Sequence, residues 1–198
     1  MKDFYETRDS IYCYKNTNVL VNKLEIKDFS RLMKIENRIA VVKAFELRQR
    51  GITGNFDKKH IIEIHKFMFE DIYYFAGAFR NENIAKDDFR FAEWQYIEEQ
   101  LDKLLLEIKN ENYFENCNKE RLANRLAYYL AELNVLHPFR EGNGRVLREF
   151  IRQLALKNGY LLDMREVNSK EMLIATKKSV YDISDLEKII YNSLKIDE

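Results

Sequence analysis

The chain contains very few of the residues that interrupt helices, and several of these stand together. Its 198 residues include one proline and six glycines, and Pro138, Gly142 and Gly144 all fall between residues 137 and 148. Proline removes a backbone donor and glycine weakens a helix, so a chain so sparing with both favours helix over most of its length. The sequence therefore predicts an all-α fold with one special loop at residues 137–148.

That loop reads His-Pro-Phe-Arg-Glu-Gly-Asn-Gly-Arg-Val-Leu-Arg. Because Pro138 disfavours helical geometry at His137, the preceding helix is expected to end there. An apolar helical pattern starts at Arg145. A Gly-Asn-Gly bend that leads into a helix directs backbone N–H groups toward an anion at the positive end of the helix dipole. With a histidine, a carboxylate and two arginines within reach, we expect the anion to be a nucleotide polyphosphate.

Apolar periodicity predicts the other helices, over about 29–50, 57–74, 94–110, 119–136, 145–158 and 184–194. The first is expected to end at Gly51 and Gly54 and to bury Leu32, Ile35, Ile39, Val42 and Phe45. Asp57 and Asn118 are N-cap candidates, and Ser184 with Glu187 is typical of a capping box.

Strand character is confined to residues 77–92. Residues 83–85 and 89–91, joined by a turn at 86–88, predict a short hairpin that must lean on the helices to be stable. The predicted architecture is a helical bundle with one small β-hairpin flap. We expect a single domain over 1–198, with its core at about 57–160, an N-terminal segment and helix at 1–56, and C-terminal helices at 161–198.

Composition excludes several classes of function. Lys plus Arg equals Asp plus Glu, at 33 each, so no basic field favours nucleic acid. Two cysteines, Cys13 and Cys117, fit a reducing compartment, and no apolar run is long enough for a membrane span. We expect a cytoplasmic protein with no nucleic-acid or membrane partner.

The loop at 137–148 matches the Fic signature His-x-Phe-x-(Asp/Glu)-Gly-Asn-Gly-Arg-x-x-Arg at every specified position. The chain also resembles Fic proteins of the bacterial toxin type at 14–16, 22–24, 75–77, Arg80 and 131–134, so the resemblance covers nearly its whole length. This resemblance implies a Fic-type helical bundle and a protein adenylyltransferase. Such an enzyme transfers AMP from ATP, with Mg²⁺, to a hydroxyl side chain of a target protein.

The resemblance assigns His137 as the general base, and histidine titrates near working pH. The alternative for a lone histidine is a helix-ending residue bonded to a nearby carbonyl. Phe139 is interpreted as an aromatic peg that fixes the loop to the core and so orients His137.

The resemblance also assigns the nucleotide contacts. Glu141 is expected to hold Mg²⁺ against the phosphates, where one or two carboxylates with phosphate oxygens suit this ion. Gly142, Asn143 and Gly144 are expected to cradle the α- and β-phosphates through backbone N–H groups and the Asn amide. Arg145 is expected to stabilise charge on the departing pyrophosphate.

Arg148 lies one helical turn beyond Arg145 and by resemblance grips the γ-phosphate or an inhibitory glutamate. A surface ion pair is the alternative for Arg148. The related Doc toxins carry lysine where this chain has Gly144, and they use the nucleotide as a phosphate donor. Gly144 therefore favours AMP transfer.

The hairpin at 83–92 is similar to the Fic flap. A free strand edge can take up an extended target segment by strand addition, with Lys86 and Phe91 as candidate clamps. The alternatives are a solvated turn for Lys86 and a core contact for Phe91. Toxin-type relatives modify type II topoisomerase subunits, so such a subunit is a candidate target.

Many Fic proteins are restrained by a glutamate in the motif (Ser/Thr)-x-x-x-Glu-(Gly/Asn), which pairs with the second arginine of the loop. In the first helix, Glu36 and Asn37 match the end of the motif, but Leu32 stands where serine or threonine is required. Near the C-terminus, Ser193 matches the start of the motif, but Asp197 and Glu198 stand where Glu and Gly or Asn are required. Neither segment matches. A separate small antitoxin is therefore expected, and a degenerate internal motif at Glu36 or at Asp197 and Glu198 stays open.

Two other hypotheses for the function remain. The same scaffold could transfer another nucleotide or phosphate, or it could be a nucleotide-binding regulatory module without catalysis, against which intact His137, Glu141 and Arg145 speak. A metal site at His60, Glu63 and His65 is disfavoured, because their spacing matches no zincin pattern. These residues are interpreted as a partly exposed helix with a packing histidine.

Overall fold

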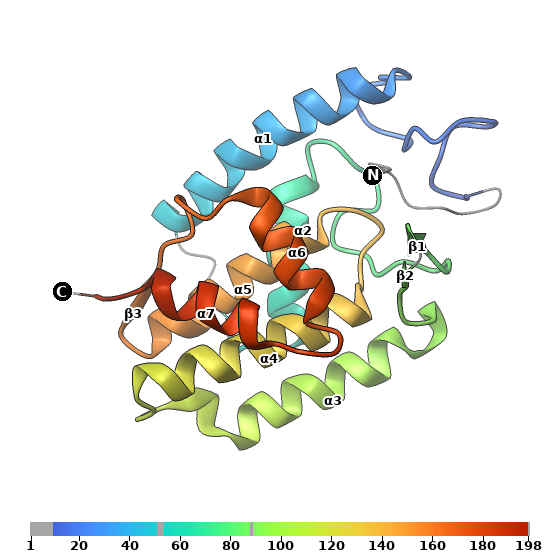
Figure 1. The fold of residues 1–198 in the computed structure, drawn as a ribbon. Helices are drawn as coiled ribbons and strands as arrows, with labels where there is room; N and C mark the ends of the chain where they lie inside the picture. The colour runs from blue at the N-terminus through green and yellow to red at the C-terminus, as the bar shows by residue number, and fades with distance from the viewer. Residues whose placement is uncertain (1–9, 51–53, 88, 198) are drawn as a thin grey trace. The chain divides into compact units, whose positions relative to one another are not determined.

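The computed structural model describes residues 10–50, 54–87 and 89–197, which cluster into two compact units. The first unit comprises residues 1–98 and 137–146, and the second comprises 99–136 and 147–198. Both are mostly helical, as predicted (Figure 1). None of the helices in the described ranges is both long and apolar enough to cross a membrane.

The first unit contains α1 (Phe29–Arg50), α2 (Lys58–Phe69), the hairpin strands β1 (Ala85–Lys86) and β2 (Phe89–Arg90), the 3₁₀ turn Trp94–Tyr96, and the loop that leads into α5 (Asn143–Lys157). α1 and α2 pack against each other. The Asp57 side chain caps α2 by accepting a hydrogen bond from the His60 N–H at 2.9 Å, as predicted. α2 ends at Phe69, earlier than the expected Tyr74.

The bounds predicted for α1 are confirmed, and the predicted inward face is right at Leu32 but wrong at Val42 and Phe45. Val42 and Phe45 are 55% and 63% exposed. The buried stripe has a different phase: Leu32, Glu36, Ala40 and Leu47. Because this stripe includes a carboxylate, hydrophobicity alone could not identify it. Of the two glycines expected to end the helix, Gly51 lies outside the described residues.

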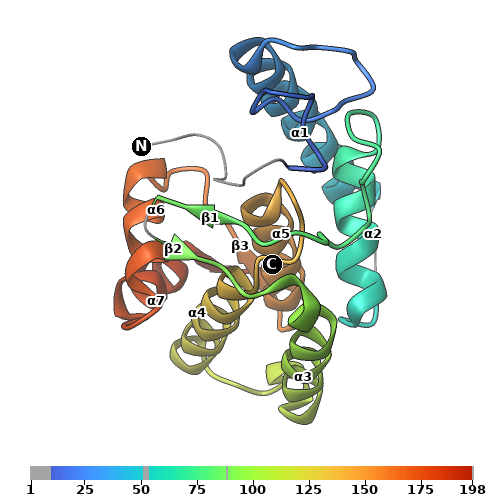
Figure 2. The ribbon, with the colours of Figure 1, turned by 90° about the vertical axis from the view of Figure 1, so that its right-hand side faces the viewer.

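The predicted hairpin is present as two antiparallel strands of two residues each (Figure 2). Ala85 pairs with Arg90 and Lys86 pairs with Phe89. Lys86 is therefore the last residue of β1 and not part of the turn. One further hydrogen bond, from the Phe91 N–H to the Ile84 carbonyl, continues the pairing toward the base of the flap.

The second unit contains most of α3 (Ile97–Asn110), the 3₁₀ turn Asn112–Phe114, α4 (Lys119–Leu136), the rest of α5, β3 (Tyr160–Leu162), α6 (Ser169–Lys178), α7 (Ser184–Ser193) and β4 (Leu194–Ile196). Asn118 caps α4 through the Arg121 N–H, as predicted. The β3–β4 pair and α6 were not predicted. The two strands have three residues each and lie more than 30 residues apart in sequence, so neither carries a local signal.

The capping box predicted for α7 is wrong. Ser184 is the first residue of the helix, and its N–H is accepted by Asp182 at 2.9 Å. Hydrogen bonds from Ser184, the backbone N–H foremost, and from Lys178 lower the pKa of Asp182 to about 2. Glu187 instead accepts a hydrogen bond from the Asn124 side chain of α4. The Glu187 carboxylate that a capping box requires is therefore used in a contact between α4 and α7.

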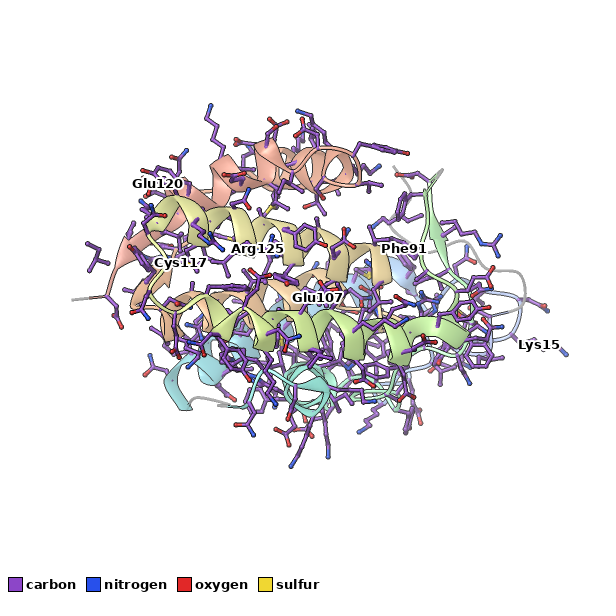
Figure 3. The ribbon with its side chains drawn as sticks, turned by 90° about the horizontal axis from the view of Figure 1, so that it is seen from below. Lys15, Phe91, Glu107, Cys117, Glu120 and Arg125 are labelled. Carbon is purple, nitrogen blue, oxygen red and sulfur yellow. The ribbon has the colours of Figure 1, made fainter. Side chains whose placement is uncertain are left out.

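Polar side chains also lie between α3 and α4, where Figure 3 marks Glu107 and Arg125. Arg125 pairs with Glu111, which also accepts the Tyr129 hydroxyl at 2.7 Å. Cys13 and Cys117 belong to different units and are free thiols.

Candidate active site

His137 is held through both its backbone and its ring. α4 ends at Leu136, and His137 adopts a left-handed conformation with φ 49° before Pro138. Its carbonyl accepts a hydrogen bond from Arg80 Nε at 2.8 Å. Its ring stacks on Phe91 at 3.8 Å between centroids, just beyond β2. The helix therefore ends where the sequence predicted, and of the two interpretations of Phe91 the structure shows the core contact.

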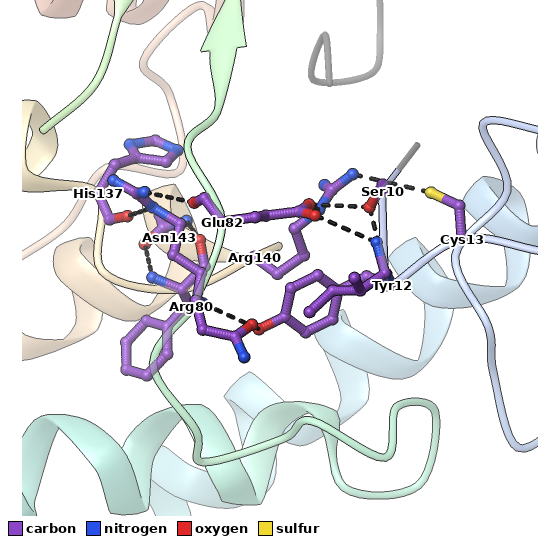
Figure 4. A network of polar contacts seen from close by, with 11 residues as sticks. Ser10, Tyr12, Cys13, Arg80, Glu82, His137, Arg140 and Asn143 are labelled. Atoms are coloured by element: carbon purple, nitrogen blue, oxygen red, sulfur yellow. Dashed lines mark hydrogen bonds and ion pairs between the residues drawn. The ribbon is translucent and has the colours of Figure 1, made fainter. Parts of the chain in front are cut away.

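Arg80 joins the base of the flap to His137, a role that sequence reasoning missed. The side chain is 2% exposed. Besides His137, its guanidinium donates to the carbonyls of Glu82, before β1, and Ala92, after β2. The Arg80 N–H also donates to the Pro138 carbonyl at 2.9 Å. One planar group thus links both ends of the hairpin to the loop (Figure 4).

Phe139 is the peg that the sequence predicted. It is fully buried and stacks on the His65 ring at 3.8 Å with an interplanar angle of 4°. The Asn143 side chain closes the loop around it, accepting from the Phe139 N–H at 2.9 Å and donating to the Phe139 carbonyl at 2.7 Å. Both ends of the Asn143 side-chain amide therefore contact the Phe139 backbone, so this amide closes the loop.

His65 supports the same loop from α2. Nδ1 accepts a hydrogen bond from the Gly77 N–H at 2.8 Å, so Nε2 carries the proton and donates to the Glu141 carbonyl at 3.1 Å. Burial lowers the pKa of His65 to about 3, which keeps the ring neutral. α2 is partly exposed, as predicted, with Lys59 and Lys66 on its solvent side. His60 and His65 are 1% and 0% exposed, so both histidines lie on its buried side.

Glu141 and Gly142 form the tightest part of the loop. Glu141 Oε1 accepts the Gly142 N–H at 2.8 Å and lies 3.5 Å from Arg145 Nη2. Gly142 has φ +82°, and a Cβ added there would lie 2.3 Å from the Phe69 ring. The described residues contain no group of three or more metal-ligating side chains. A single carboxylate beside a phosphate site nevertheless fits the mode in which Mg²⁺ binds.

The Gly-Asn-Gly segment, which the sequence predicts to bind an anion, leads into the N-terminus of α5. The helix begins at Asn143, two residues earlier than expected. The N–H groups of Arg145 and Val146 donate to the Gly142 carbonyl. Among the described residues, the N–H groups of Asn143 and Gly144 have no acceptor. These two N–H groups lie at the positive end of the helix dipole, where phosphate oxygens bind.

Arg145 is anchored by residues that are distant in sequence. Its Nη2 pairs with Glu36 of α1, whose other carboxylate oxygen accepts the Tyr73 hydroxyl. Its guanidinium lies 4.8 Å from the centre of the Phe69 ring. Burial raises the pKa of Glu36, nearby Glu141 raises it further, and Arg145 opposes both. From the sequence alone, Glu36 was a candidate only for the inhibitory glutamate.

The N-terminal segment contacts the loop through Arg140, which is 4% exposed (Figure 4). Arg140 Nε donates to Glu82 Oε1 at 2.7 Å, and the same oxygen accepts the Ser10 hydroxyl at 2.8 Å. The Tyr12 hydroxyl donates to Asn81 Oδ1 at 2.6 Å. This network fixes residues 10–12 to the segment between Arg80 and the flap.

The remaining predicted residues lie in the second unit. Arg148 is half-buried in α5, three residues beyond Arg145. Asp197 donates its N–H to the Gly159 carbonyl at 3.0 Å, and Glu198 lies outside the described residues.

Comparison with known proteins agrees with this geometry. The model of the Fic/DOC family matches residues 55–155. The protein adenylyltransferase VbhT of Bartonella schoenbuchensis is 41% identical over 92% of this chain, which spans 38% of VbhT. The probable protein adenylyltransferase Fic of Salmonella typhimurium is 32% identical, over 96% of this chain and 94% of that protein.

A solved structure gives the same fold. The BepC protein of Bartonella tribocorum, crystallised with bound AMPPNP, superposes with a TM-score of 0.86 at 24% identity, covering 94% of this chain and 97% of BepC. The match to the family model and the 32% identity to the Salmonella relative show that the chain belongs to the Fic/DOC family.

Proposed function

We propose that this protein transfers AMP from ATP to a hydroxyl side chain of a target protein. One observation carries the proposal: a single compact unit holds His137 against the foot of the flap and also contains the α5 N-terminus and Arg145. The proposed base, anion site and cation are therefore parts of one structure. The names of VbhT and the Salmonella relative support the same activity.

The proposed step is an in-line displacement at the α-phosphorus. The target hydroxyl oxygen forms a bond to the α-phosphorus while His137 takes the hydroxyl proton. The bond from that phosphorus to the bridging oxygen breaks, and pyrophosphate leaves. Arg145 and the N–H groups of Asn143 and Gly144 stabilise the charge on the phosphate oxygens as it develops.

Glu141 would hold Mg²⁺, which neutralises phosphate charge when it is bound. Glu141 is restrained for this task at two points. Its carbonyl accepts from His65, and its carboxylate accepts the Gly142 N–H. His65 and Phe139 thus support the proposed metal-binding residue as well as the loop.

Gly144 favours AMP transfer over phosphate transfer, because the loop lacks the lysine of the Doc toxins. Incubation with ATP labelled at either the α- or the γ-phosphate tests this directly. Protein labelled only from the α position supports the proposal. Label from the γ position would indicate phosphate transfer, and bound nucleotide without any label would indicate a regulatory module.

The target segment would add as a strand to the flap, which has only two short strands and so leaves backbone groups at its edge. Lys86 stands beside the tip and would contact the target, whereas Phe91 lies beneath, on His137. A type II topoisomerase subunit is the candidate target. Lysate proteins that the wild-type protein labels with AMP, and that the His137→Ala variant does not label, would identify the target.

A separate small antitoxin would inhibit the protein. The protein would act as a toxin in the cytoplasm, where ATP is abundant. Glu36 supports an external inhibitor, because it pairs with Arg145, the first arginine of the loop, whereas the glutamate of the inhibitory motif pairs with the second. We expect AMP labelling to be lost when the protein is co-expressed with a small helical protein encoded beside its gene. Full activity in that presence would contradict this part of the proposal.

A further inference from the structure

Glu36 is the most deeply buried carboxylate near the proposed phosphate site. Its side chain is 0% exposed, although it belongs to α1 and lies 109 residues from Arg145 in sequence. A carboxylate withdrawn from water is costly unless it is paired and hydrogen-bonded. Glu36 meets both conditions, because one oxygen pairs with Arg145 and the other accepts the Tyr73 hydroxyl.

The contacts of Arg145 leave part of its guanidinium available. Glu36 takes Nη2, while Nη1 lies at 3.4 Å from Asn37 Oδ1, a long and exposed contact. Among the described residues, Nε has no hydrogen-bond partner. Since an arginine offers five N–H donors in a rigid plane, fixing one corner sets the direction of the others.

We infer that Glu36, itself held by Tyr73, is a positioning residue that orients Arg145 toward the β- and γ-phosphates of ATP. This inference rests on the proposed adenylyl transfer. Tyr73 is fully buried, and its ring stacks on Phe75 at 4.7 Å, so the hydroxyl reaches Glu36 from a fixed direction. α1 thereby becomes part of the active site although it contains no motif residue.

The opposite role for the same residue is inhibition, in which Glu36 competes with the phosphates. The two roles predict effects of opposite sign. Removing a competitor strengthens ATP binding and raises transfer, whereas removing a positioning group weakens both. The contact itself favours positioning, because Glu36 binds the first arginine of the loop and belongs to the buried stripe of α1.

The test compares the affinities of ATP and AMP by calorimetry with Mg²⁺ present. Glu36→Gln and Tyr73→Phe should weaken ATP by about tenfold and leave AMP within twofold, because Arg145 acts on phosphates that AMP lacks. Val41→Ala is the control on the same helix, because its side chain is 71% exposed, and it should change neither affinity by more than about twofold. Equal losses for ATP and AMP, or tighter ATP binding, would overturn the inference.

A double-variant cycle shows whether the effect runs through Arg145. On an Arg145→Gln background, Glu36→Gln should cause no further loss of ATP affinity. An undiminished loss on that background would overturn the inference. Tyr73→Phe leaves every charge in place, so it serves if Glu36→Gln fails to fold.

A ligand-free readout separates this inference from the proposed function. Slow rotation of the Arg145 guanidinium, seen as separate Nη resonances by NMR, is expected in the wild type and should be lost in Tyr73→Phe. Absence of transfer from either labelled position would refute the proposed function but would leave this readout intact. Free rotation in the wild type would refute the positioning role alone.

Discussion

Gly142 offers a quantitative test of how the loop is built. Replacing it with alanine would force an L residue to φ +82° and bring its Cβ within 2.3 Å of the Phe69 ring. The left-handed conformation costs about 1–2 kcal/mol, the overpacked contact costs about 1–3 kcal/mol, and lost unfolded-state freedom returns about 0.4–1 kcal/mol. Gly142→Ala should therefore lower the free energy of unfolding by about 2–4 kcal/mol, measured by urea denaturation.

Gly159 is the matched control, because its φ is +77° and an added Cβ would meet nothing within 4 Å. Gly159→Ala should cost only the backbone contribution, about 0.5–1 kcal/mol. Phe69→Leu should partly rescue Gly142→Ala, because a shorter side chain relieves the contact. Equal losses at the two glycines would refute the argument that Phe69 excludes a side chain at Gly142.

Three further predictions concern the groups around the loop. His137→Ala should lower AMP transfer by about 10²–10⁴-fold and leave ATP affinity nearly unchanged, because the base acts on the hydroxyl; an equal loss of ATP affinity by calorimetry would contradict this. Arg80→Lys replaces a fork that reaches three carbonyls with one ammonium, so transfer should fall by about tenfold at retained ATP affinity; unchanged transfer would exclude the clamp. The folded-state pKa of His65, about 3, lies below its unfolded value of about 6.5, so the unfolded chain binds the proton first and stability is lost as pH falls from about 6.5 toward 3. The loss from this group is at most about 1.4 kcal/mol per pH unit, and His65→Gln should flatten the stability profile between about pH 6.5 and 4.5; identical profiles for the two proteins would exclude His65 as the cause.

Local sequence signals predicted the fold well where the determinants were themselves local. The caps at Asp57 and Asn118, the bounds of α1 and the end of α4 just before Pro138 each depend on residues within a turn or two. The capping box at Ser184 failed for a tertiary reason, because Asn124 of α4 binds Glu187.

The motif predicted which side chains carry the proposed chemistry, but not what holds them. Arg80, His65 and Glu36 reach the loop across 57, 76 and 109 residues of sequence, and no local pattern encodes such pairings. One signal was available for Glu36, which lies four residues after Leu32 and four before Ala40. Assigning the buried face of α1 to that stripe would have marked a carboxylate in the core as a residue in need of a partner.

Mass spectrometry of proteins exposed to the purified chain, ATP and Mg²⁺ tests the central claim most directly. We predict a target peptide whose mass has increased by one AMP group on a hydroxyl side chain, with pyrophosphate as the second product. The modification should be absent with the His137→Ala variant. A peptide that gained only phosphate, or an AMP adduct that persists without His137, would contradict the account.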